Sequence, residues 1–365
     1  MSGTRTQGRI RVGVIGASSS GGWAMYAHLP ALQALPQFEL TAVSTTRKAS
    51  AEETARRFGV PHAFEGAEAL VTHPDVDLVV VSVKTPEHDR WVRAAIHAGK
   101  HVFCEWPLGA SLAQTTALHA LAEKAGVRHA IGLQRRLAPS VRYLKDLLAE
   151  GYLGKLRSVT LHAAMPPLGA RRAANVAYTA DVANGASALT IFTAHYLDMV
   201  LHAVGEPREF SAVVARQFDH TTIIETGEVL PVSTPDQVLL SGTLRNGAVL
   251  SAHFEAGKRN GGSIRWTLTG TEGDLVVTDD YQLLAARGDG QALEPLPIPE
   301  RYSWLPLGAL DPEAHRMAHV YAGFARDLAE GTRTAPDFTD AVNRYRLLDA
   351  IQRSSDTGQR QVWNG

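Results

Sequence analysis

Cysteine is nearly absent from this sequence: Cys104 is the only one among 365 residues. One thiol cannot form an internal disulfide or a cysteine-based zinc cluster. A chain without disulfides is typical of a reducing compartment, so we expect a cytoplasmic protein.

The sequence also lacks a charge excess and a long apolar run. Its 36 basic and 37 acidic residues leave a net charge of −1, which does not favour a polyanion or a membrane surface as partner. No apolar stretch approaches the roughly 20 residues of a membrane span, and residues 1–8 lack the apolar core of a secretory signal. We therefore expect a small-molecule substrate, and neither nucleic acid nor membrane as partner.

A length of 365 residues indicates two domains of ordinary size. In the first part of the chain, short β-branched runs alternate with helical patterns, which predicts a parallel sheet with right-handed crossovers. The expected strands are 10–15, 38–43, 76–83, 101–104 and 128–132, and the expected helices are 23–35, 49–58, 87–98 and 112–125. Residues 9–136 are thus predicted to form a dinucleotide-binding Rossmann domain of the α/β class.

Residues 137–365 are predicted to form an α+β domain around an open, largely antiparallel sheet that carries the substrate site. Its strands follow one another with few helices between them, and residues 246–247 and 271–273 are turn signals. The expected strands are 156–163, 209–215, 238–244, 248–254, 263–269 and 274–278, and the expected helices are 187–204, 313–330 and 337–354. One face of such a sheet must be covered, so we expect a homo-oligomer, a dimer or tetramer, formed through it.

A turn rich in glycine and serine follows the first predicted strand. Gly16 would make the tight turn, and Gly21 or Gly22 would let the helix approach the strand closely. Backbone N–H groups at the helix start, with the helix dipole, favour a pyrophosphate there. Ser18 replaces the second glycine of the usual fingerprint, and a merely tight turn is the alternative. The residues expected to contact the cofactor are Gly16, Ser18, Ser19, Ser20, Gly22 and Trp23.

The end of the second predicted strand bears on the choice of dinucleotide. An acidic residue there binds the ribose diol of NAD, whereas a basic one accommodates the 2′-phosphate of NADP. This chain has Thr46, Arg47 and Lys48, with no acidic residue before Glu52. The segment therefore favours NADP over NAD, the alternative being that Arg47 and Lys48 only solvate a loop.

Three later segments form a recognisable pattern. They read Val81-Ser-Val-Lys-Thr-Pro-Glu-His88, Ala98-Gly-Lys-His-Val-Phe-Cys-Glu-Trp-Pro-Leu108 and Gly132-Leu-Gln-Arg-Arg136. In order and spacing they resemble the Gfo/Idh/MocA oxidoreductases, and later motifs extend the resemblance over nearly the whole chain. The resemblance implies the fold predicted above, with the second domain closing over the nicotinamide. It implies that the cofactor cleft includes Lys84, Thr85, His88, Glu105, Trp106 and Gln134.

The chain departs from the family pattern at two positions. The family usually has lysine where this chain has Trp106, and aspartate where it has Ile191. Both changes resemble the branch of the fungal galactose-pathway repressor, a non-enzymatic member that binds dinucleotide. The resemblance therefore leaves two functions open, an oxidoreductase and a regulatory protein that senses a dinucleotide.

A catalytic role depends chiefly on His195. Hydride transfer between nicotinamide and a carbinol carbon needs a group that accepts or supplies the hydroxyl proton, and neutral imidazole suits this near pH 7. Asp198 follows three residues later on the same predicted helix and would tune His195 if the two side chains met. The alternative is a histidine that only packs or caps.

Trp106 cannot transfer a proton, and we expect it to stack on a sugar ring or on nicotinamide and to shape the substrate pocket. A buried packing tryptophan is the alternative. Further candidates for substrate contacts are Asp181, Asn184 and Arg135. No catalytic metal is expected, because the pair Asp219-His220 lacks a third ligand.

The sequence thus predicts an NAD(P)-dependent oxidoreductase that acts on the CH–OH group of a sugar, polyol or glycoside-like alcohol or ketone. The alternative is a non-catalytic, dinucleotide-sensing regulatory protein.

Overall fold

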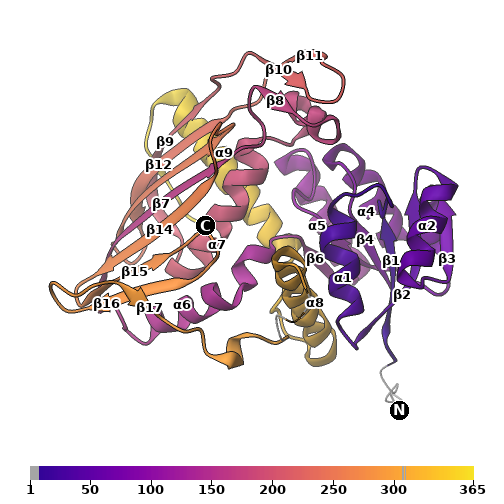
Figure 1. Cartoon of the computed structure of the whole chain (residues 1–365), viewed down its shortest axis with the longest axis horizontal. Helices are drawn as coiled ribbons and strands as arrows, with labels where there is room; N and C mark the ends of the chain where they lie inside the picture. Colours follow the sequence, from indigo (N-terminus) through magenta and orange to yellow (C-terminus); the bar gives the residue numbers. More distant parts are fainter. Residues whose placement is uncertain (1–7, 306–307, 309) are drawn as a thin grey trace. The chain divides into compact units, whose positions relative to one another are not determined.

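The computed structural model describes residues 8–305, 308 and 310–365, and its chain divides into two compact units (Figure 1). The first unit comprises Met1–Leu137 and Trp304–Val342, and the second comprises Ala138–Ser303 and Asn343–Gly365.

The first unit is built on a six-stranded parallel sheet with the order β3-β2-β1-β4-β5-β6. This is the strand order of doubly wound dinucleotide-binding domains. The strands are β1 (Ile10–Ile15), β2 (Phe38–Thr45), β3 (His62–Glu65), β4 (Leu78–Val81), β5 (His101–Cys104) and β6 (His129–Ile131). The helices between them are the π-helix η1 (Ala24–His28), α1 (Leu29–Gln33), α2 (Lys48–Phe58), α3 (Glu68–Thr72), α4 (His88–His97) and α5 (Leu112–Ala125). The Rossmann fold predicted from the alternating pattern is confirmed.

Helix α8 (Pro312–Glu330) belongs to this first unit, although the sequence analysis assigned it to the second domain. The apolar face of α8 explains why this helix belongs to the first unit. Tyr321 and Phe324 are buried in the core cluster of the Rossmann sheet, and the ring centroids of Tyr321 and Phe103 lie 4.9 Å apart. The helix therefore covers the sheet beside α1 and completes its core.

The second unit contains a nine-stranded sheet with the order β17-β16-β15-β14-β7-β13-β12-β9-β18. The strands are β7 (Leu156–Met165), β9 (Pro207–Ala215), β12 (Gln237–Leu244), β13 (Val249–Ala256), β14 (Ser263–Gly270), β15 (Gly273–Val277), β16 (Leu283–Arg287), β17 (Glu294–Pro295) and β18 (Gln361–Val362). A smaller sheet joins β8 (Arg171–Arg172), β10 (His220–Ile223) and β11 (Val229–Pro231). The helices are α6 (Pro139–Ala149), the π-helix η6 (Ala188–Thr193), α7 (Ala194–Val204) and α9 (Phe338–Thr357), within which the division between the units falls. Among the described strands of the large sheet, only β7 and β13 pair in parallel, so this sheet is mainly antiparallel, as predicted.

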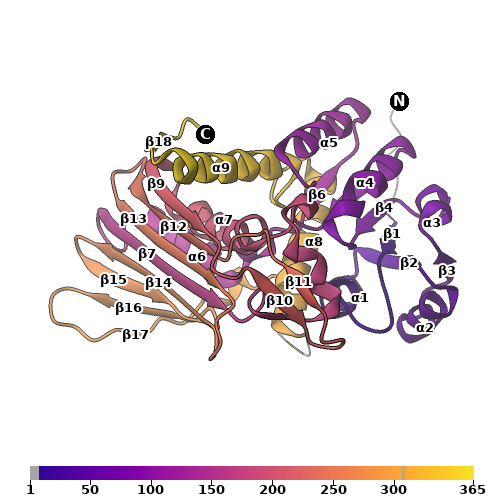
Figure 2. The same ribbon diagram turned by 90° about the horizontal axis from the view of Figure 1, so that it is seen from above.

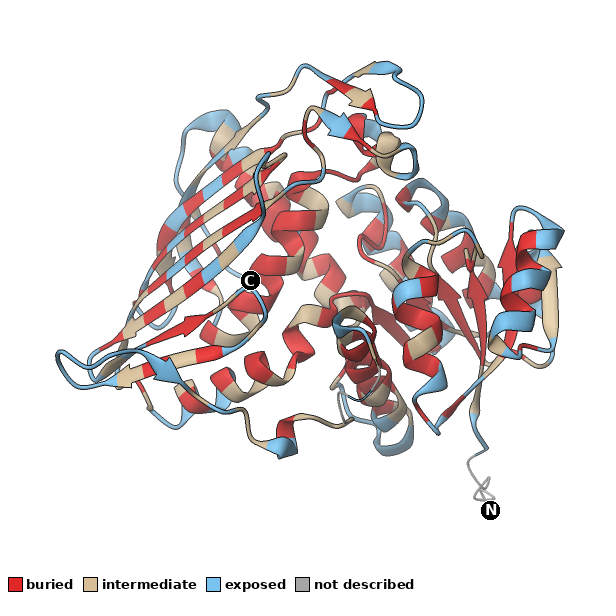
Figure 3. Ribbon diagram, viewed as in Figure 1, coloured by how far each residue is buried: buried red, intermediate tan, exposed pale blue. Residues whose placement is uncertain are grey.

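The two faces of the large sheet differ in burial, because buried and exposed residues alternate along its central strands (Figures 2 and 3). On the buried face, Phe254 meets the ring of Phe192 from η6. The opposite face exposes Val213, Leu239 and Val249.

Within the described part of the chain, no helix has both the length and the apolar character that crossing a membrane requires.

Candidate functional site

The turn after β1 depends on glycine at three positions. Gly16 has a φ of +91°, and a Cβ there would lie 2.1 Å from the carbonyl oxygen of Ser82. Gly21 and Gly22 have φ values of +116° and +113°, which side chains other than glycine rarely allow. A Cβ on Gly22 would meet no atom within 4 Å, and one on Gly21 none closer than 3.5 Å. The backbone conformation, and not the close helix–strand contact that we expected, therefore explains these two glycines.

Helix α2 holds this turn through two hydroxyl groups. The buried Ser50 Oγ lies 3.2 Å from the hydroxyls of Ser18 and Ser19, and it accepts the Ser19 N–H at 3.2 Å. One helical turn later, the hydroxyl of Thr54 donates to the carbonyl of Ala17 at 2.8 Å. Three consecutive residues of the turn are thus tied to one face of α2. Neither Ser50 nor Thr54 was predicted as a site residue. The feature of the sequence that could have indicated them is the four-residue spacing of two hydroxyl side chains on one helix.

Several backbone donors in the turn are left for a ligand. Among the described residues, the N–H groups of Ser20, Gly22 and Trp23 have no acceptor, whereas the Gly21 N–H donates to Ser18. The chain then enters the π-helix η1, a rare conformation that is frequent at functional sites. N–H groups at a helix start bind phosphate oxygens well.

The end of β2 offers one cation for recognition of the dinucleotide. Thr45 Oγ1 bonds to both the N–H and the carbonyl of Arg47, which makes a tight turn and leaves Arg47 exposed. The ammonium of Lys48 is already engaged by a β3 carbonyl at 2.6 Å. The Arg47 guanidinium forms no ion pair with any described residue. The hydroxyl of Ser44 is buried and has no hydrogen-bond partner in the described structure.

Glu105, directly after β5, is held by His28, which in turn contacts Tyr321. His28 Nε2 lies 2.9 Å from Glu105 Oε1, and His28 Nδ1 lies 2.6 Å from the hydroxyl of Tyr321. Burial, with the nearby negative charge of Glu105, raises the pKa of Tyr321 well above its ordinary value. A Cβ on Gly132 would lie 2.5 Å from Oε1, so only glycine leaves room for this carboxylate. Glu105 therefore also anchors the core in addition to any contact with the cofactor.

His88 is buried, and its two ring nitrogens face backbone carbonyls. Nδ1 lies 2.7 Å from Pro107 O and Nε2 lies 3.0 Å from Val83 O. Burial lowers the pKa of His88, and a neutral imidazole donates to one carbonyl at a time. Through its contact with the Pro107 carbonyl, His88 positions the segment that contains Trp106 and Pro107, which are joined by a cis peptide bond. Trp106 itself is 5% exposed, which fits a wall better than a solvent contact.

The remaining predicted residues of the first unit have mixed surroundings. Thr46 and Lys84 are exposed, and Thr85 is buried. Gln134 is 2% exposed, and within the described structure its Oε1 accepts no hydrogen bond. Since buried polar atoms are nearly always paired, Gln134 is a candidate ligand contact. Arg135 lies 3.6 Å from Glu313, so part of its charge is already compensated.

These residues of the first unit share one edge of the Rossmann sheet. Gly16, Thr46, Lys84, Glu105 and Gln134 follow β1, β2, β4, β5 and β6 respectively. The carboxyl ends of parallel strands meet at the same edge, which is where open α/β sheets bind ligands.

In the second unit, His195 is the second residue of α7, the helix that directly follows the π-helix η6. A capping box formed by Ser187 and Thr190 fixes the start of η6. His195 is half-buried. Asp198 is 1% exposed, and its Oδ1 lies 3.6 Å from Nε of Arg344. Arg344, which also pairs with Glu206, compensates part of the negative charge of Asp198.

Asp181 and Asn184 form local bonds in the loop before this helix. Asp181 is exposed and accepts the Ala183 N–H at 3.0 Å. Asn184 Nδ2 donates to the carbonyl of Tyr178 at 2.7 Å. Both side chains therefore stabilise the loop, whatever contacts they form with a substrate.

Two family models cover most of the chain. Residues 10–133 match the oxidoreductase family with an NAD-binding Rossmann fold, and residues 139–279 match the C-terminal domain of Gal80p. The dTDP-3,4-didehydro-2,6-dideoxy-alpha-D-glucose 3-reductase of Actinomadura kijaniata is 36% identical over 97% of this chain and 97% of its own length. The chain belongs to the Gfo/Idh/MocA oxidoreductase family. The resemblance on which the sequence analysis relied is thereby confirmed, including its Gal80p-like branch.

Two solved structures share the fold of the whole chain. A super-repressor mutant of Gal80p from Saccharomyces cerevisiae has a TM-score of 0.86 at 23% identity and covers 97% of this chain and 98% of its own. A levoglucosan dehydrogenase in complex with NADH and levoglucosan has a TM-score of 0.85 at 23% identity, with coverages of 97% and 99%. The fold of this chain is thus equally similar to the fold of a regulatory protein and to that of an enzyme.

The hydroxyl of Ser50 offers a test of the loop. Ser50→Ala removes the bonds to Ser18 and Ser19, and we expect the dissociation constant for NADPH to rise roughly 3- to 10-fold, the effect of about one hydrogen bond. The measurement is a fluorescence titration. The matched control is Glu53→Ala, an exposed position on the same helix. Equal affinities for NADPH in both variants would show that α2 does not position the loop.

Proposed function

We propose that this chain is an NADP(H)-dependent oxidoreductase acting on the CH–OH or keto group of a sugar, polyol or glycoside-like compound. The turn after β1 carries the proposal, because three of its N–H groups have no acceptor among the described residues and helix α2 fixes its shape. Such a turn at a helix start suits a pyrophosphate. The names of two similar proteins, a reductase of a dTDP-linked sugar and a levoglucosan dehydrogenase, support a sugar-like substrate.

Proton transfer falls to His195 in this proposal. When bound, the nicotinamide supplies or accepts the hydride. As an alcohol is oxidised, its hydroxyl proton passes to the neutral imidazole; as a ketone is reduced, the imidazolium returns it. Trp106 and Ile191 cannot exchange a proton, so His195 alone remains of the three polar groups that the family usually has.

Trp106 and Gln134 are proposed to shape the pocket. A buried indole offers a flat apolar surface on which a sugar ring or the nicotinamide can stack. The unpaired Oε1 of Gln134 can accept a hydrogen bond from a carboxamide or a hydroxyl group. Asp181 and Asn184 retain a proposed contact with substrate through the oxygen atoms that are not used in the loop.

The exposed valines and leucine on the large sheet support a second proposal, a dimer or tetramer formed through that face. Val213, Leu239 and Val249 are each at least 44% exposed on the face that no helix of the second unit covers. Light scattering measures this directly, and a monomer at micromolar concentration would contradict it.

A regulatory protein that binds a dinucleotide is the second candidate function. The observation that favours it is the replacement of the two usual polar residues by Trp106 and Ile191, together with the match to the C-terminal domain of Gal80p. Such a protein would bind NADPH or NADH and convert no substrate. Turnover therefore separates the two functions.

His195→Gln tests the catalytic proposal. We expect wild-type protein to change the nicotinamide absorbance with at least one member of a panel of sugars and sugar lactones or ketones. In the variant, kcat should fall about 100-fold or more, because general acid–base catalysis is lost, while the dissociation constant for NADPH stays the same. His220→Gln, an exposed histidine of β10, is the control. NADPH binding without turnover across the panel would instead support the regulatory protein.

Arg47→Ala tests the choice of dinucleotide. The lost charge–phosphate bond should weaken NADPH binding about 10-fold and leave NADH binding within 2-fold. Lys48→Ala is the matched control, since its ammonium already binds a backbone carbonyl. Equal weakening of both dinucleotides, or no change in either, would refute the assignment to NADP.

A further inference from the structure

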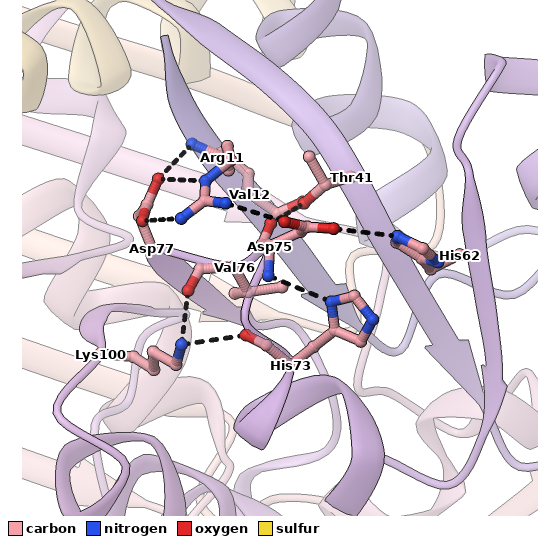
Figure 4. A network of polar contacts seen from close by, with 9 residues as sticks. All are labelled: Arg11, Val12, Thr41, His62, His73, Asp75, Val76, Asp77 and Lys100. Atoms are coloured by element: carbon pink, nitrogen blue, oxygen red, sulfur yellow. Dashed lines mark hydrogen bonds and ion pairs between the residues drawn. The ribbon is translucent and has the colours of Figure 1, made fainter. Parts of the chain in front are cut away.

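Two histidines and an aspartate meet at the amino ends of β3 and β4 (Figure 4). His62 begins β3, His73 ends α3, and Asp75 lies in the turn before β4. His62 Nε2 is 3.4 Å from Asp75 Oδ2, and the Asp75 N–H donates to His73 Nδ1 at 3.2 Å. One potential ligand atom from each residue lies within 4.8 Å of the other two, and all three residues are half-buried.

A surrounding network fixes the backbone and one oxygen of this cluster. Arg11 Nη1 donates to Asp75 Oδ1 at 2.9 Å, which leaves Oδ2 on the side of the histidines. The hydroxyl of Thr41 donates to the Asp75 carbonyl at 2.7 Å, and Lys100 Nζ donates to the His73 carbonyl at 3.0 Å. Hydrogen bonds of this kind behind a ligand set orient it and strengthen metal binding.

The positive charge of Arg11 does not fully cancel the negative charge of Asp75, because the carboxylate of Asp77 also binds the Arg11 guanidinium. Arg11 forms two bonds to Asp77, from Nε at 2.9 Å and from Nη2 at 2.8 Å. Arg11 is thus shared between two carboxylates, and the Oδ2 atom of Asp75, on the side of the histidines, is left to offer a cation.

We propose that His62, His73 and Asp75 bind one divalent transition-metal ion of the zinc type. His62 would bind through Nε2 and His73 through Nδ1, the atoms that already face Asp75. Two imidazoles and one carboxylate favour zinc, nickel or copper over magnesium or calcium. Zn–N bonds of about 2.0–2.1 Å require the ligand atoms to move closer together by small side-chain rotations. For this the neutral His62 ring carries its proton on Nδ1, so that Nε2 offers its lone pair, and the Asp75 N–H gives up its hydrogen bond to His73 Nδ1.

A second cluster, His119, Glu123 and His129, has similar spacing but different hydrogen bonds. His129 Nδ1 accepts the N–H of Phe338 at 3.2 Å, so the neutral ring carries its proton on Nε2, which faces Glu123 at 3.0 Å. An ion beside Glu123 would also have to compete with the hydroxyl of Thr339, which lies 3.3 Å from Nε2 of His119. This cluster therefore serves as an internal control.

The proposed metal site is independent of the proposed oxidoreductase function. It lies at the amino ends of the strands, whereas the turn after β1 lies at their carboxyl ends. Saturation with NADPH should therefore leave the affinity for metal unchanged.

The test is calorimetric titration of the full, untagged, chelator-treated chain with zinc sulfate at pH 7.5, with magnesium sulfate as a contrast. We expect one zinc ion per chain and no magnesium binding. His62→Gln, His73→Gln and Asp75→Asn should each weaken zinc binding about 10-fold or more, whereas His119→Gln should not. Circular dichroism checks that each variant is folded.

Either of two results would overturn the proposal. One is a zinc affinity that is unchanged in every folded variant of the three ligands. The other is a loss in His119→Gln as large as the loss in those variants. Neither result depends on whether the protein turns over a sugar.

Discussion

The proposed dinucleotide site depends on the confinement of the turn after β1 between strand β4 and helix α2. On one side, the Ser82 carbonyl leaves no room for a side chain on Gly16. On the other, Ser50 and Thr54 bind three consecutive residues of the turn. A loop held from both sides loses little conformational entropy when a ligand arrives, so its N–H groups are organised before the dinucleotide binds.

Much of this fold could be predicted, because apolar periodicity reports burial. The strand at 10–15 and the helix at 112–125 have the predicted bounds, and the wholly buried β4 follows from its run of valines. Strand β3 was missed, since its four residues are only partly buried and show no clear alternation. The place of α8 was missed for another reason. Its amphipathic pattern shows that it packs against something, but not which of two sheets.

The candidate site was predictable to a different degree in each part. The positions after the strands of the Rossmann sheet followed from the βα pattern and from the family resemblance. Tertiary contacts could not be read from the sequence, so His88 was expected at a ligand, whereas its two ring nitrogens face backbone carbonyls. Likewise, the partner of Asp198 is Arg344, which is 146 positions later in the sequence and outside any local pattern.

The proteins similar to this chain include both enzymes and a regulatory protein, and an enzyme of this kind needs groups that can move a proton. This chain has Trp106 and Ile191 at two positions where the family usually has such groups, while the turn after β1 keeps N–H groups that are open to a ligand. The proposed binding of a dinucleotide therefore does not depend on the proposed catalysis. Conservation of the fold does not decide between them.

A crystal structure of the protein with NADPH would show directly whether the turn after β1 holds the pyrophosphate. We expect the pyrophosphate oxygens to accept hydrogen bonds from the N–H groups of Ser20, Gly22 and Trp23, with Ser50 still bonded to Ser18 and Ser19. A pyrophosphate bound elsewhere, or a turn released from α2 in the complex, would contradict this expectation.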